Sequence, residues 1–327
     1  MSSSNRIRVL IPENMAEAGR ALLRPRGDLE VVGYPPTIAQ AAFHELLPEA
    51  EGVVLSLTPF REPEAAASPK LRVVCRIGVG YDSVEVPALT RRKVPLMTTG
   101  TANSISVAEH ALYFILTLAK RGPKQDSLAR GNRWHERYGS MPDELAGKTA
   151  LVVGFGRIGT RSAARLGAFD VHVLVYDPYV SAEAIRAAGY EPVADLDAAL
   201  PRADFVTVHC PKNTETTGLL NAARLRKMKR SAYVVNTARG GIIDEDALLA
   251  ALNEGVIAGA GLDVFVQEPP PANHPLLVHE KVVTAPHMAG VTRESVDKMA
   301  IAAAENLLSV LDGQPRRENA VNPEVFG

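Results

Sequence analysis

The stretch Thr149–Gly159, TALVVGFGRIG, decides the fold that this sequence predicts. A run of strand-forming residues leads directly into three glycines with G-x-G-x-x-G spacing, and a helical pattern follows at Ile158–Leu166. Gly154 permits a tight turn, Gly156 lets a pyrophosphate approach the backbone, and Gly159 allows close packing of helix and strand. The amino end of the helix offers N–H groups and the positive end of its dipole to the phosphates. The stretch therefore predicts a dinucleotide-binding strand–turn–helix unit.

An acidic residue at the end of the next predicted strand supports this interpretation. In such units the acid stands about 20 residues after the glycines, and Asp177 ends the run VHVLVYD near that distance. Its carboxylate can accept hydrogen bonds from the adenosine ribose and would repel a 2′-phosphate. Pro178 and Tyr179 supply no cation to offset that repulsion, so the pattern favours NAD over NADP. The alternative is a glycine-rich turn followed by a helix-capping aspartate.

The rest of the chain alternates short β-branched runs with longer helical patterns, which is typical of parallel sheets with crossover helices. The expected strands are Ile7–Ile11, Leu29–Val32, Gly52–Leu55, Val73–Ile77 and Val94–Thr98, then Thr149–Gly154, Val171–Tyr176, Phe205–His209, Tyr233–Asn236, Ala258–Asp263 and Val282–Thr284. The clearest helical patterns are Met15–Leu23, Ile38–Leu47, Ser104–Lys120 and Arg293–Leu311, and a polar stretch occupies residues 121–134. We therefore expect an α/β protein with two Rossmann-like or flavodoxin-like parallel-sheet domains.

The composition excludes several classes of protein. The chain has 327 residues, of which 46% are hydrophobic, and a formal net charge of −1, so we expect no nucleic-acid partner. Cys75 and Cys210 lie in apolar, strand-like runs and are predicted to be buried free thiols, and no Cys/His cluster has the spacing of a metal site. The N-terminus lacks the apolar segment of a signal peptide, and the apolar run Ala111–Ala119 is too short to cross a bilayer. We expect a soluble, cytoplasmic protein with no membrane partner.

Three polar residues stand just beyond predicted strands, where the loops of open α/β sheets line ligand sites. Arg239 follows YVVN, Glu268 follows GLDVF, and His287 follows VVTAP. The arginine can bind a carboxylate or keto oxygen bidentately, the histidine can exchange a proton with that oxygen, and the glutamate can fix the tautomer and favour the imidazolium. With NAD bound, these residues suit hydride transfer between a 2-hydroxy acid and a 2-keto acid. Taken singly, each is also compatible with a solvated or locally hydrogen-bonded loop residue, so spacing alone leaves the assignment open.

From Gly154 to Glu294 the sequence resembles the D-2-hydroxyacid dehydrogenase family, which includes glyoxylate, hydroxypyruvate and D-3-phosphoglycerate enzymes. The matching motifs are GFGRIG, VNTARGGIIDEDALLAAL, GAGLDVFVQEP and APHMAGVTRES, and weaker similarity extends over nearly the whole chain. The resemblance implies that Arg239 binds the substrate, that His287 donates and accepts the proton, and that Glu268 is the partner of His287.

The same resemblance implies a division of the chain and further contacts. A discontinuous substrate domain would comprise residues 1–101 and 293–327, and a dinucleotide-binding Rossmann domain would comprise residues 102–292. The backbone amides of Val79 and Gly80 would hold the substrate carboxylate, which Arg239 and His287 also contact. Besides the three glycines and Asp177, the residues implied to contact the cofactor are Arg157, Ile158, Cys210, Pro211, Thr216, Ala238, Arg239, Asp263, His287 and Val107.

The apolar helix at Ser104–Lys120 and the polar stretch ending at Trp134 resemble the dimerisation region of the family. We therefore expect a homodimer with two-fold symmetry. Trp134, the only tryptophan, is a candidate to reach the substrate pocket of the neighbouring subunit. For Val107, a place in the helix core is the alternative to a cofactor contact.

One departure from the family bears on the substrate. The phosphoglycerate enzymes usually carry an Arg-Ser-x-Thr stretch whose arginine helps to bind the phosphate, and here the matching residues are Leu55-Ser56-Leu57-Thr58. A small unphosphorylated keto acid such as glyoxylate or hydroxypyruvate is therefore expected. D-3-phosphoglycerate stays an alternative, with Arg61 or Arg76 as the substitute cation. An NAD(H)-sensing binding protein without catalysis, like the corepressors that share this fold, is the alternative of another class.

Overall fold

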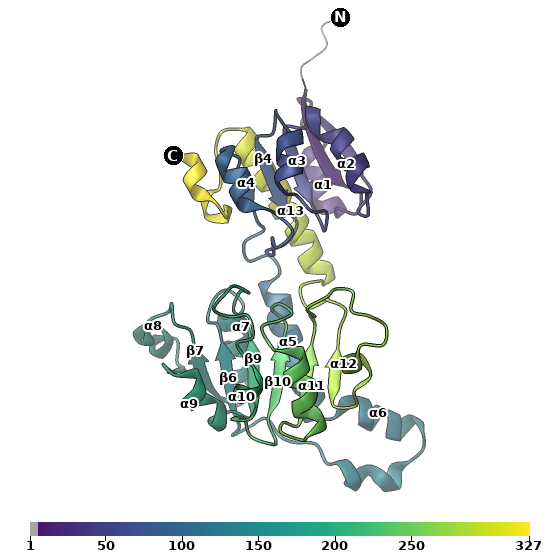
Figure 1. Cartoon of the computed structure of the whole chain (residues 1–327), viewed down its shortest axis with the longest axis vertical. Coiled ribbons are helices and arrows are strands. Elements are labelled where there is room, and N and C mark those ends of the chain that lie inside the picture. The colour runs from purple at the N-terminus through teal and green to yellow at the C-terminus, as the bar shows by residue number, and fades with distance from the viewer. Residues whose placement is uncertain (1–5) are drawn as a thin grey trace, which may run out of the picture. The chain divides into compact units, whose positions relative to one another are not determined.

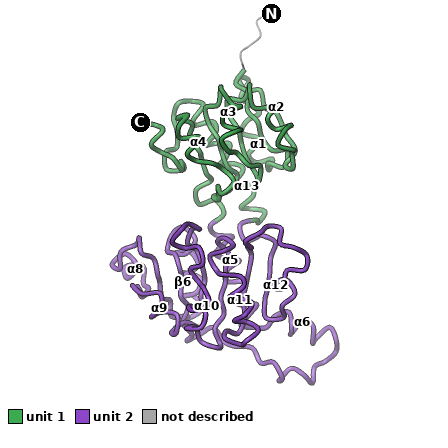
Figure 2. The backbone as a smooth tube through the Cα atoms, viewed as in Figure 1, with its two compact units in different colours: residues 1–103, 291–327 green, residues 104–290 purple. Residues whose placement is uncertain are grey.

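The computed structural model describes residues 6–327, which form two units, each built around its own parallel β-sheet (Figure 1). Unit 1 comprises residues 1–103 and 291–327, and unit 2 comprises residues 104–290 (Figure 2). The strands of both sheets pair in parallel throughout. The predicted fold class, two parallel-sheet α/β domains of which one is discontinuous in sequence, is confirmed.

Unit 1 has a five-stranded sheet with the order β2-β1-β3-β4-β5. Its strands are β1 (Ile7–Pro12), β2 (Leu29–Tyr34), β3 (Gly52–Leu55), β4 (Val73–Arg76) and β5 (Leu96–Met97), and its α-helices are α1 (Glu17–Leu23), α2 (Gln40–Leu46), α3 (Glu62–Ala67), α4 (Val86–Arg91) and α13 (Arg293–Leu311). Val9 packs with α1 and α13 on one face of the sheet, whereas Leu10 packs with α2, α3 and α4 on the other. This alternation follows from the two-residue period of a strand, and it gives the unit two hydrophobic layers.

Unit 2 has a seven-stranded sheet with the order β12-β11-β10-β9-β6-β7-β8. Its strands are β6 (Thr149–Val153), β7 (His172–Tyr176), β8 (Glu191–Pro192), β9 (Phe205–Val208), β10 (Tyr233–Asn236), β11 (Gly259–Leu262) and β12 (Val282–Thr284). Its α-helices are α5 (Ser104–Ala119), α6 (Gly122–Arg130), α7 (Gly159–Gly167), α8 (Ala182–Ala187), α9 (Leu196–Ala199), α10 (Ala222–Leu225), α11 (Glu245–Asn253) and α12 (Pro275–Val278). Buried side chains of α5 and α7 cover one face, and those of α9, α10, α11 and α12 cover the other. Because β7 and β9 flank β6 on opposite sides, the carboxyl ends of β6 and β9 form the topological switch point, where open α/β sheets bind ligands.

The long helix α13 packs with α1 in unit 1, although it follows unit 2 in the sequence. Its amino end has a capping box, in which the Thr292 side chain accepts a hydrogen bond from the Ser295 amide and the Ser295 side chain accepts one from Thr292. A Cβ on Gly19 of α1 would lie 2.4 Å from the carbonyl oxygen of Ala300, so glycine lets the two helices approach closely. The helix predicted at Arg293–Leu311 is confirmed with both of its ends.

Most predicted strands agree with the structure to within two residues at each end, and the largest differences concern two strands. The strand expected at Val94–Thr98 is shortened to Leu96–Met97, since Pro95 has no N–H to donate to a ladder. The edge strand Glu191–Pro192 is absent from the prediction, because two residues carry no alternation by which a strand could be recognised.

Two further differences concern the polar stretch and one cysteine. The polar residues 121–134 contain the helix Gly122–Arg130, which has a proline in its first turn and buries only Leu128. Cys75 is buried as predicted, but Cys210 is partly exposed because it lies past the end of its strand. Both thiols are free.

Candidate active site

The turn after β6 contains three glycines, two of which have no space for a side chain and one of which has. Gly154 has a φ of +95°, and a Cβ on it would lie 2.7 Å from the amide nitrogen of Cys210. A Cβ on Gly159 would lie 1.9 Å from the carbonyl oxygen of Gly154, so neither position accepts a side chain. Around Gly156, by contrast, no atom of the described residues lies within 4 Å of a Cβ position. A phosphate group can therefore approach the backbone closely at Gly156.

The carboxylate of Asp177 is fixed beside this turn. It accepts a hydrogen bond from the Phe155 amide at 2.7 Å and one from the Tyr179 amide at 2.9 Å. The Asp177 carboxylate therefore lies at the carboxyl end of β7. It is hydrogen-bonded to Phe155, the residue directly before the open Gly156 position. An adenosine ribose suits this carboxylate, and a pyrophosphate suits the turn and the amino end of α7. The residues present thus fit NAD.

The segment that follows β9, at the switch point, is held in place by its own hydrogen bonds. The Thr216 hydroxyl donates to the Pro211 carbonyl oxygen at 2.7 Å and accepts from the Asn213 amide at 2.8 Å. Burial raises the pKa of the Cys210 thiol to about 11, so the sulfur stays protonated near neutral pH. The thiolate form, which is the nucleophilic form of cysteine, is therefore scarce at Cys210.

His287 and Glu268 meet in a short hydrogen bond of 2.6 Å between Nδ1 and Oε2. The second oxygen of Glu268 accepts from the Phe265 amide at 3.0 Å. Burial opposes ionisation of Glu268, but the hydrogen bonds from His287 and Phe265 outweigh it and hold the pKa of the carboxyl below its usual range. Glu268 is therefore a carboxylate at neutral pH. It orients the imidazole through Nδ1, so that Nε2 is the ring nitrogen not engaged by Glu268.

Asp263 holds the backbone on which His287 stands. Its carbonyl oxygen accepts from the His287 amide at 2.8 Å, and its carboxylate accepts from the amides of Met288 at 2.7 Å and Ala289 at 2.9 Å. His287 has a φ of +54°, a left-handed conformation that costs a residue with a side chain about 1–2 kcal/mol. These hydrogen bonds stabilise that conformation. Asp263 thus positions the histidine loop, a role beyond the cofactor contact that the resemblance implies.

Arg239 lies in a turn whose backbone is hydrogen-bonded to the side chain of Asn236, the last residue of β10. The Asn236 side-chain nitrogen donates to the Arg239 carbonyl oxygen at 2.9 Å, and the side-chain oxygen accepts from the Ala238 amide at 3.0 Å. The Arg239 guanidinium itself donates to the Ala238 carbonyl oxygen at 2.7 Å. The arginine is therefore presented from a preformed turn rather than from a loose loop.

The turn of Arg239 packs directly on the loop that carries Glu268. A Cβ on Gly240 would lie 2.0 Å from the carbonyl carbon of Phe265, so the two backbones touch at this glycine. The charge of Arg239 also helps to lower the pKa of the Glu268 carboxyl, after the hydrogen bonds described above. The structure therefore brings Arg239, Glu268 and His287 together beyond the carboxyl ends of β10, β11 and β12.

Two other histidines of unit 2 are poorly suited to proton exchange. Burial lowers the pKa of His209 to about 3, and burial also lowers the pKa of His110. The imidazole of His209 is therefore neutral at pH 7. His287, with 48% of its side chain exposed and a carboxylate partner, is the histidine that suits acid–base chemistry.

The remaining predicted residues lie at three places. Val79 and Gly80 belong to unit 1, in the turn that follows β4. Arg157 and Ile158 lie in unit 2, between the open glycine and the first turn of α7. Val107 lies within α5 and is 5% exposed.

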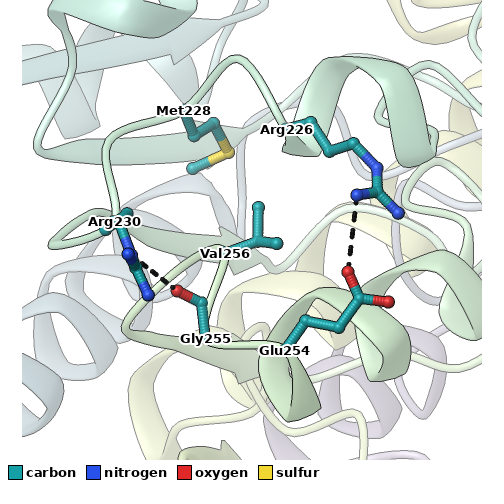
Figure 3. Close-up of a pocket in the computed structure, with 6 residues that line it drawn as sticks. All are labelled: Arg226, Met228, Arg230, Glu254, Gly255 and Val256. Carbon is teal, nitrogen blue, oxygen red and sulfur yellow. Dashed lines mark hydrogen bonds and ion pairs between the residues drawn. The ribbon is translucent and has the colours of Figure 1, made fainter.

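Unit 2 also has a cavity of about 320 Å³ near the amino ends of its strands (Figure 3). It is lined by Arg226, Met228, Arg230, Glu254, Gly255 and Val256, which precede β10 and β11. Arg226 pairs with Glu254 at 3.4 Å, and Arg230 donates to the Gly255 carbonyl oxygen at 3.3 Å. Since it lies at the amino ends of the strands, this cavity is separate from the candidate active site.

Two supporting residues of the site, Asn236 and Gly240, are not among those predicted from the sequence. Asn236 could have been found as a polar residue that ends an otherwise apolar strand just before the Arg239 turn, and Gly240 as half of a glycine pair. Within residues 6–327 no helix is long and apolar enough to cross a membrane, and no three His, Cys, Asp or Glu side chains form a metal-binding group.

A Rossmann-like sheet with a dinucleotide turn and an imidazole–carboxylate pair at the carboxyl ends of its strands defines an NAD-binding oxidoreductase. The description "D-isomer specific 2-hydroxyacid dehydrogenase, NAD binding domain" belongs to the family model that matches residues 112–289. The chain belongs to this dehydrogenase family. The predicted family, the oxidoreductase class and the cofactor NAD are thereby confirmed.

Similar proteins carry two different names. A glyoxylate reductase of Thermofilum pendens is 37% identical over 328 residues, with 98% of this chain and 96% of that protein covered. A D-3-phosphoglycerate dehydrogenase of Archaeoglobus fulgidus is 38% identical over 317 residues, and the match covers 97% of this chain but only 59% of that protein. Among solved structures, a glyoxylate reductase from Paecilomyes thermophila has a TM-score of 0.87 at 25% identity, covering 98% of this chain and 99% of that one. The TT0316 protein of Thermus thermophilus has a TM-score of 0.86 at 32% identity, covering 96% of this chain and 100% of that one.

Proposed function

We propose that this dehydrogenase is a cytoplasmic enzyme that interconverts a small unphosphorylated D-2-hydroxy acid and its 2-keto acid, of the glyoxylate or hydroxypyruvate type. The observation that carries the proposal is the 2.6 Å hydrogen bond between His287 and Glu268, beside the turn of Arg239. The same pair of relatives, one named a glyoxylate reductase and one a D-3-phosphoglycerate dehydrogenase, supports the reaction class and leaves the substrate to be decided. The location rests on the two free thiols, which suit a reducing compartment.

Each polar residue of the site has a distinct task in this reaction. NAD supplies the hydride acceptor, and its reduced form the hydride donor. Arg239 binds the carboxylate or keto oxygen of the substrate with its planar fork of donors. Nε2 of His287 gives a proton to the keto oxygen during reduction and takes the hydroxyl proton during oxidation. Glu268 stabilises the imidazolium, and the backbone amides of Val79 and Gly80 are proposed to hold the substrate carboxylate.

The proposal of an unphosphorylated substrate is supported by Leu55 of unit 1. Leu55, which replaces the arginine of the phosphoglycerate enzymes, is fully buried in the core of unit 1 and places no cation there. A phosphate therefore lacks its usual partner at this position. One observation favours D-3-phosphoglycerate as the second candidate: the Arg76 guanidinium lies 3.3 Å from a Cβ position on Gly78, in the turn that leads to Val79.

A panel of keto acids tests the substrate. With NADH, we expect kcat/KM for glyoxylate or hydroxypyruvate to exceed that for 3-phosphohydroxypyruvate by about 10-fold or more, since a buried leucine offers the phosphate no partner. Absorbance of the nicotinamide band measures each rate. Arg76→Leu and a matched Arg61→Leu variant show whether either cation compensates. Preference for the phosphorylated acid, lost in Arg76→Leu and kept in Arg61→Leu, would instead establish the second candidate.

Asp177 predicts the choice of cofactor. The fixed carboxylate repels a 2′-phosphate, so kcat/KM with NADH exceeds that with NADPH by about 10-fold or more, a difference of one charge repulsion at short range. The double substitution Asp177→Ser with Pro178→Arg removes the repulsion, adds a phosphate partner and reduces the preference. Steady-state rates with both cofactors provide the measurement, and higher efficiency of the unmodified enzyme with NADPH contradicts the role of Asp177.

We propose that two chains form a homodimer through unit 2. Large apolar side chains are exposed there, among them Tyr113 at 52%, Trp134 at 61% and Met141 at 65%. Sedimentation at micromolar concentration is expected to give twice the 35.0 kDa mass of one chain. Tyr113→Asp should shift the equilibrium toward single chains and move the emission of Trp134 to longer wavelength. A species of one chain mass for the unmodified protein would rule the dimer out.

A further inference from the structure

His110 and Asp263 interact electrostatically, although the two residues are far apart in the sequence. On α5, His110 and Phe114 are four residues apart and share one face, and their rings meet edge-on with centroids 4.5 Å apart. Phe114 in turn sits on β11, because a Cβ on Gly261 would lie 2.8 Å from the Phe114 Cβ. Gly261 and Asp263 are two residues apart along an extended chain and point to the same side of the sheet. His110, one helical turn from Phe114 on the helix that packs against β11, is therefore placed near Asp263, with which it interacts electrostatically.

The charges of the two residues reflect this proximity. Burial lowers the pKa of His110, and the charge of Asp263 opposes that effect. Burial raises the pKa of Asp263, and the amides of Ala289 and Met288 oppose it, followed by the charges of His110 and His287. Asp263 is thus faced by His110 from α5 and by His287 from the loop after β12. His110 faces Asp263 and also meets the ring of Tyr113, with ring centroids 5.3 Å apart.

Further polar atoms lie on the same side of the sheet. Thr237 continues β10 opposite Asp263, because Asn236 pairs with Leu262 and Asp263 donates its amide to Asn236. Val235 packs with α5, so Thr237, two residues on, points toward the same helix. Within residues 6–327, the buried atoms Nε2 of His110 and Oγ1 of Thr237 have no hydrogen-bond partner. Buried polar groups are satisfied by protein or by ordered water, so water shared among His110, Thr237 and Asp263 suits this place.

We propose that His110 is a positioning residue: with Thr237, it holds the Asp263 carboxylate where it receives the Met288 and Ala289 amides, and so fixes the left-handed backbone of His287. The inference rests on the proposed acid–base role of His287. Its physical basis is that a buried carboxylate with two backbone donors needs further polar partners to stay ionised and in place. His110 then acts on the reaction through Asp263, without touching the substrate.

Two substitutions separate this role from simple packing. His110→Phe keeps a ring against Phe114 and removes the polar atoms, whereas His110→Asn keeps polar atoms and removes the ring. We expect His110→Phe to lower kcat about 10–100-fold, in line with the effect of an approximately 1 Å misplacement of a catalytic group. KM for the keto acid and affinity for NADH should change little. His110→Asn should retain most of kcat, and Thr237→Val, which removes only a hydroxyl, should lower kcat in the same direction as His110→Phe.

Hydrogen exchange provides a readout that needs no turnover. In His110→Phe and Thr237→Val, the peptide covering residues 285–290 should exchange faster, because the Met288 and Ala289 amides lose their firm acceptor, while peptides of unit 1 stay unchanged. If the enzyme proves inactive on every keto acid, the proposed function fails and this measurement still decides the role of His110. A packing role gives the reverse order, with His110→Phe harmless and His110→Asn damaging. Unmodified kcat and exchange in His110→Phe would overturn the proposal.

Discussion

Replacing His287 by alanine lowers kcat for reduction of the 2-keto acid by about 10²–10⁴-fold, the usual contribution of a positioned general acid. Nδ1 of this histidine is held by Glu268 at 2.6 Å, so Nε2 is the nitrogen that delivers the proton. Affinity for NADH changes little, because the proposed phosphate and ribose contacts lie at Gly156 and Asp177 on other strands. Steady-state kcat and KM, with NADH binding followed by nicotinamide fluorescence, measure the two effects separately.

The pH dependence has opposite signs in the two directions. Reduction needs a protonated His287 and oxidation needs a neutral one, so kcat for reduction falls and kcat for oxidation rises as the pH increases. The pKa of Glu268 is held below its usual range, so this carboxylate stays charged throughout. Glu268→Gln removes the charge that stabilises the imidazolium and should move the reduction profile to lower pH. Rates against pH in both directions, for both enzymes, provide the measurement.

Arg239→Ala is the contrasting variant. Its loss removes a substrate contact, so KM for the keto acid rises strongly while the midpoint of the pH profile stays near that of the unmodified enzyme. A His287→Ala enzyme with near-normal turnover would refute the mechanism, and the role of Glu268 with it. The alternative hypothesis, a protein that binds NAD(H) without catalysis, would then be favoured.

The fold could be predicted from the sequence wherever local pattern and tertiary packing agree. The helix Arg293–Leu311 was predicted with both ends because a capping threonine and a terminal glycine bound a long apolar pattern. The strand at Leu96–Met97 and the edge strand Glu191–Pro192 were mispredicted, because two-residue strands are defined by their neighbours and not by their own composition. The helix Gly122–Arg130 is nearly all polar, so no apolar face announces it.

The reactive side chains of the candidate site could be predicted from the sequence, but the residues that position them could not. Arg239, Glu268 and His287 stand out as reactive side chains after strands, and the parallel sheet brings such positions to one edge. The three hydrogen bonds that Asp263 accepts from amides of the His287 loop were not predictable, because they join residues about 25 positions apart through a backbone with a φ of +54°. The same is true of His110, whose neighbour on β11 is decided by how α5 crosses the sheet.

Gly159→Ala is expected to damage folding and cofactor binding together. A Cβ at this position would lie 1.9 Å from the carbonyl oxygen of Gly154, which is backbone and cannot rotate away. The turn must therefore open, and we expect the free energy of unfolding to fall by about 1–3 kcal/mol or more. Because the same turn receives the pyrophosphate, NADH affinity should fall as well. Thermal unfolding and fluorescence titration with NADH measure both quantities.

Substitutions at two other glycines distinguish an effect on folding from an effect on cofactor binding. A Cβ on Gly156 meets no described atom within 4 Å, so Gly156→Ala should fold with an unchanged Tm and still lose NADH affinity, since its methyl group occupies the place of the pyrophosphate. Gly139→Ala, equally open but remote from β6, should change neither property. Equal stability of the Gly159 and Gly156 variants would show that the turn can relax. Unchanged NADH binding by Gly156→Ala would show that the phosphates lie elsewhere, and the proposed orientation of the cofactor would then have to be abandoned.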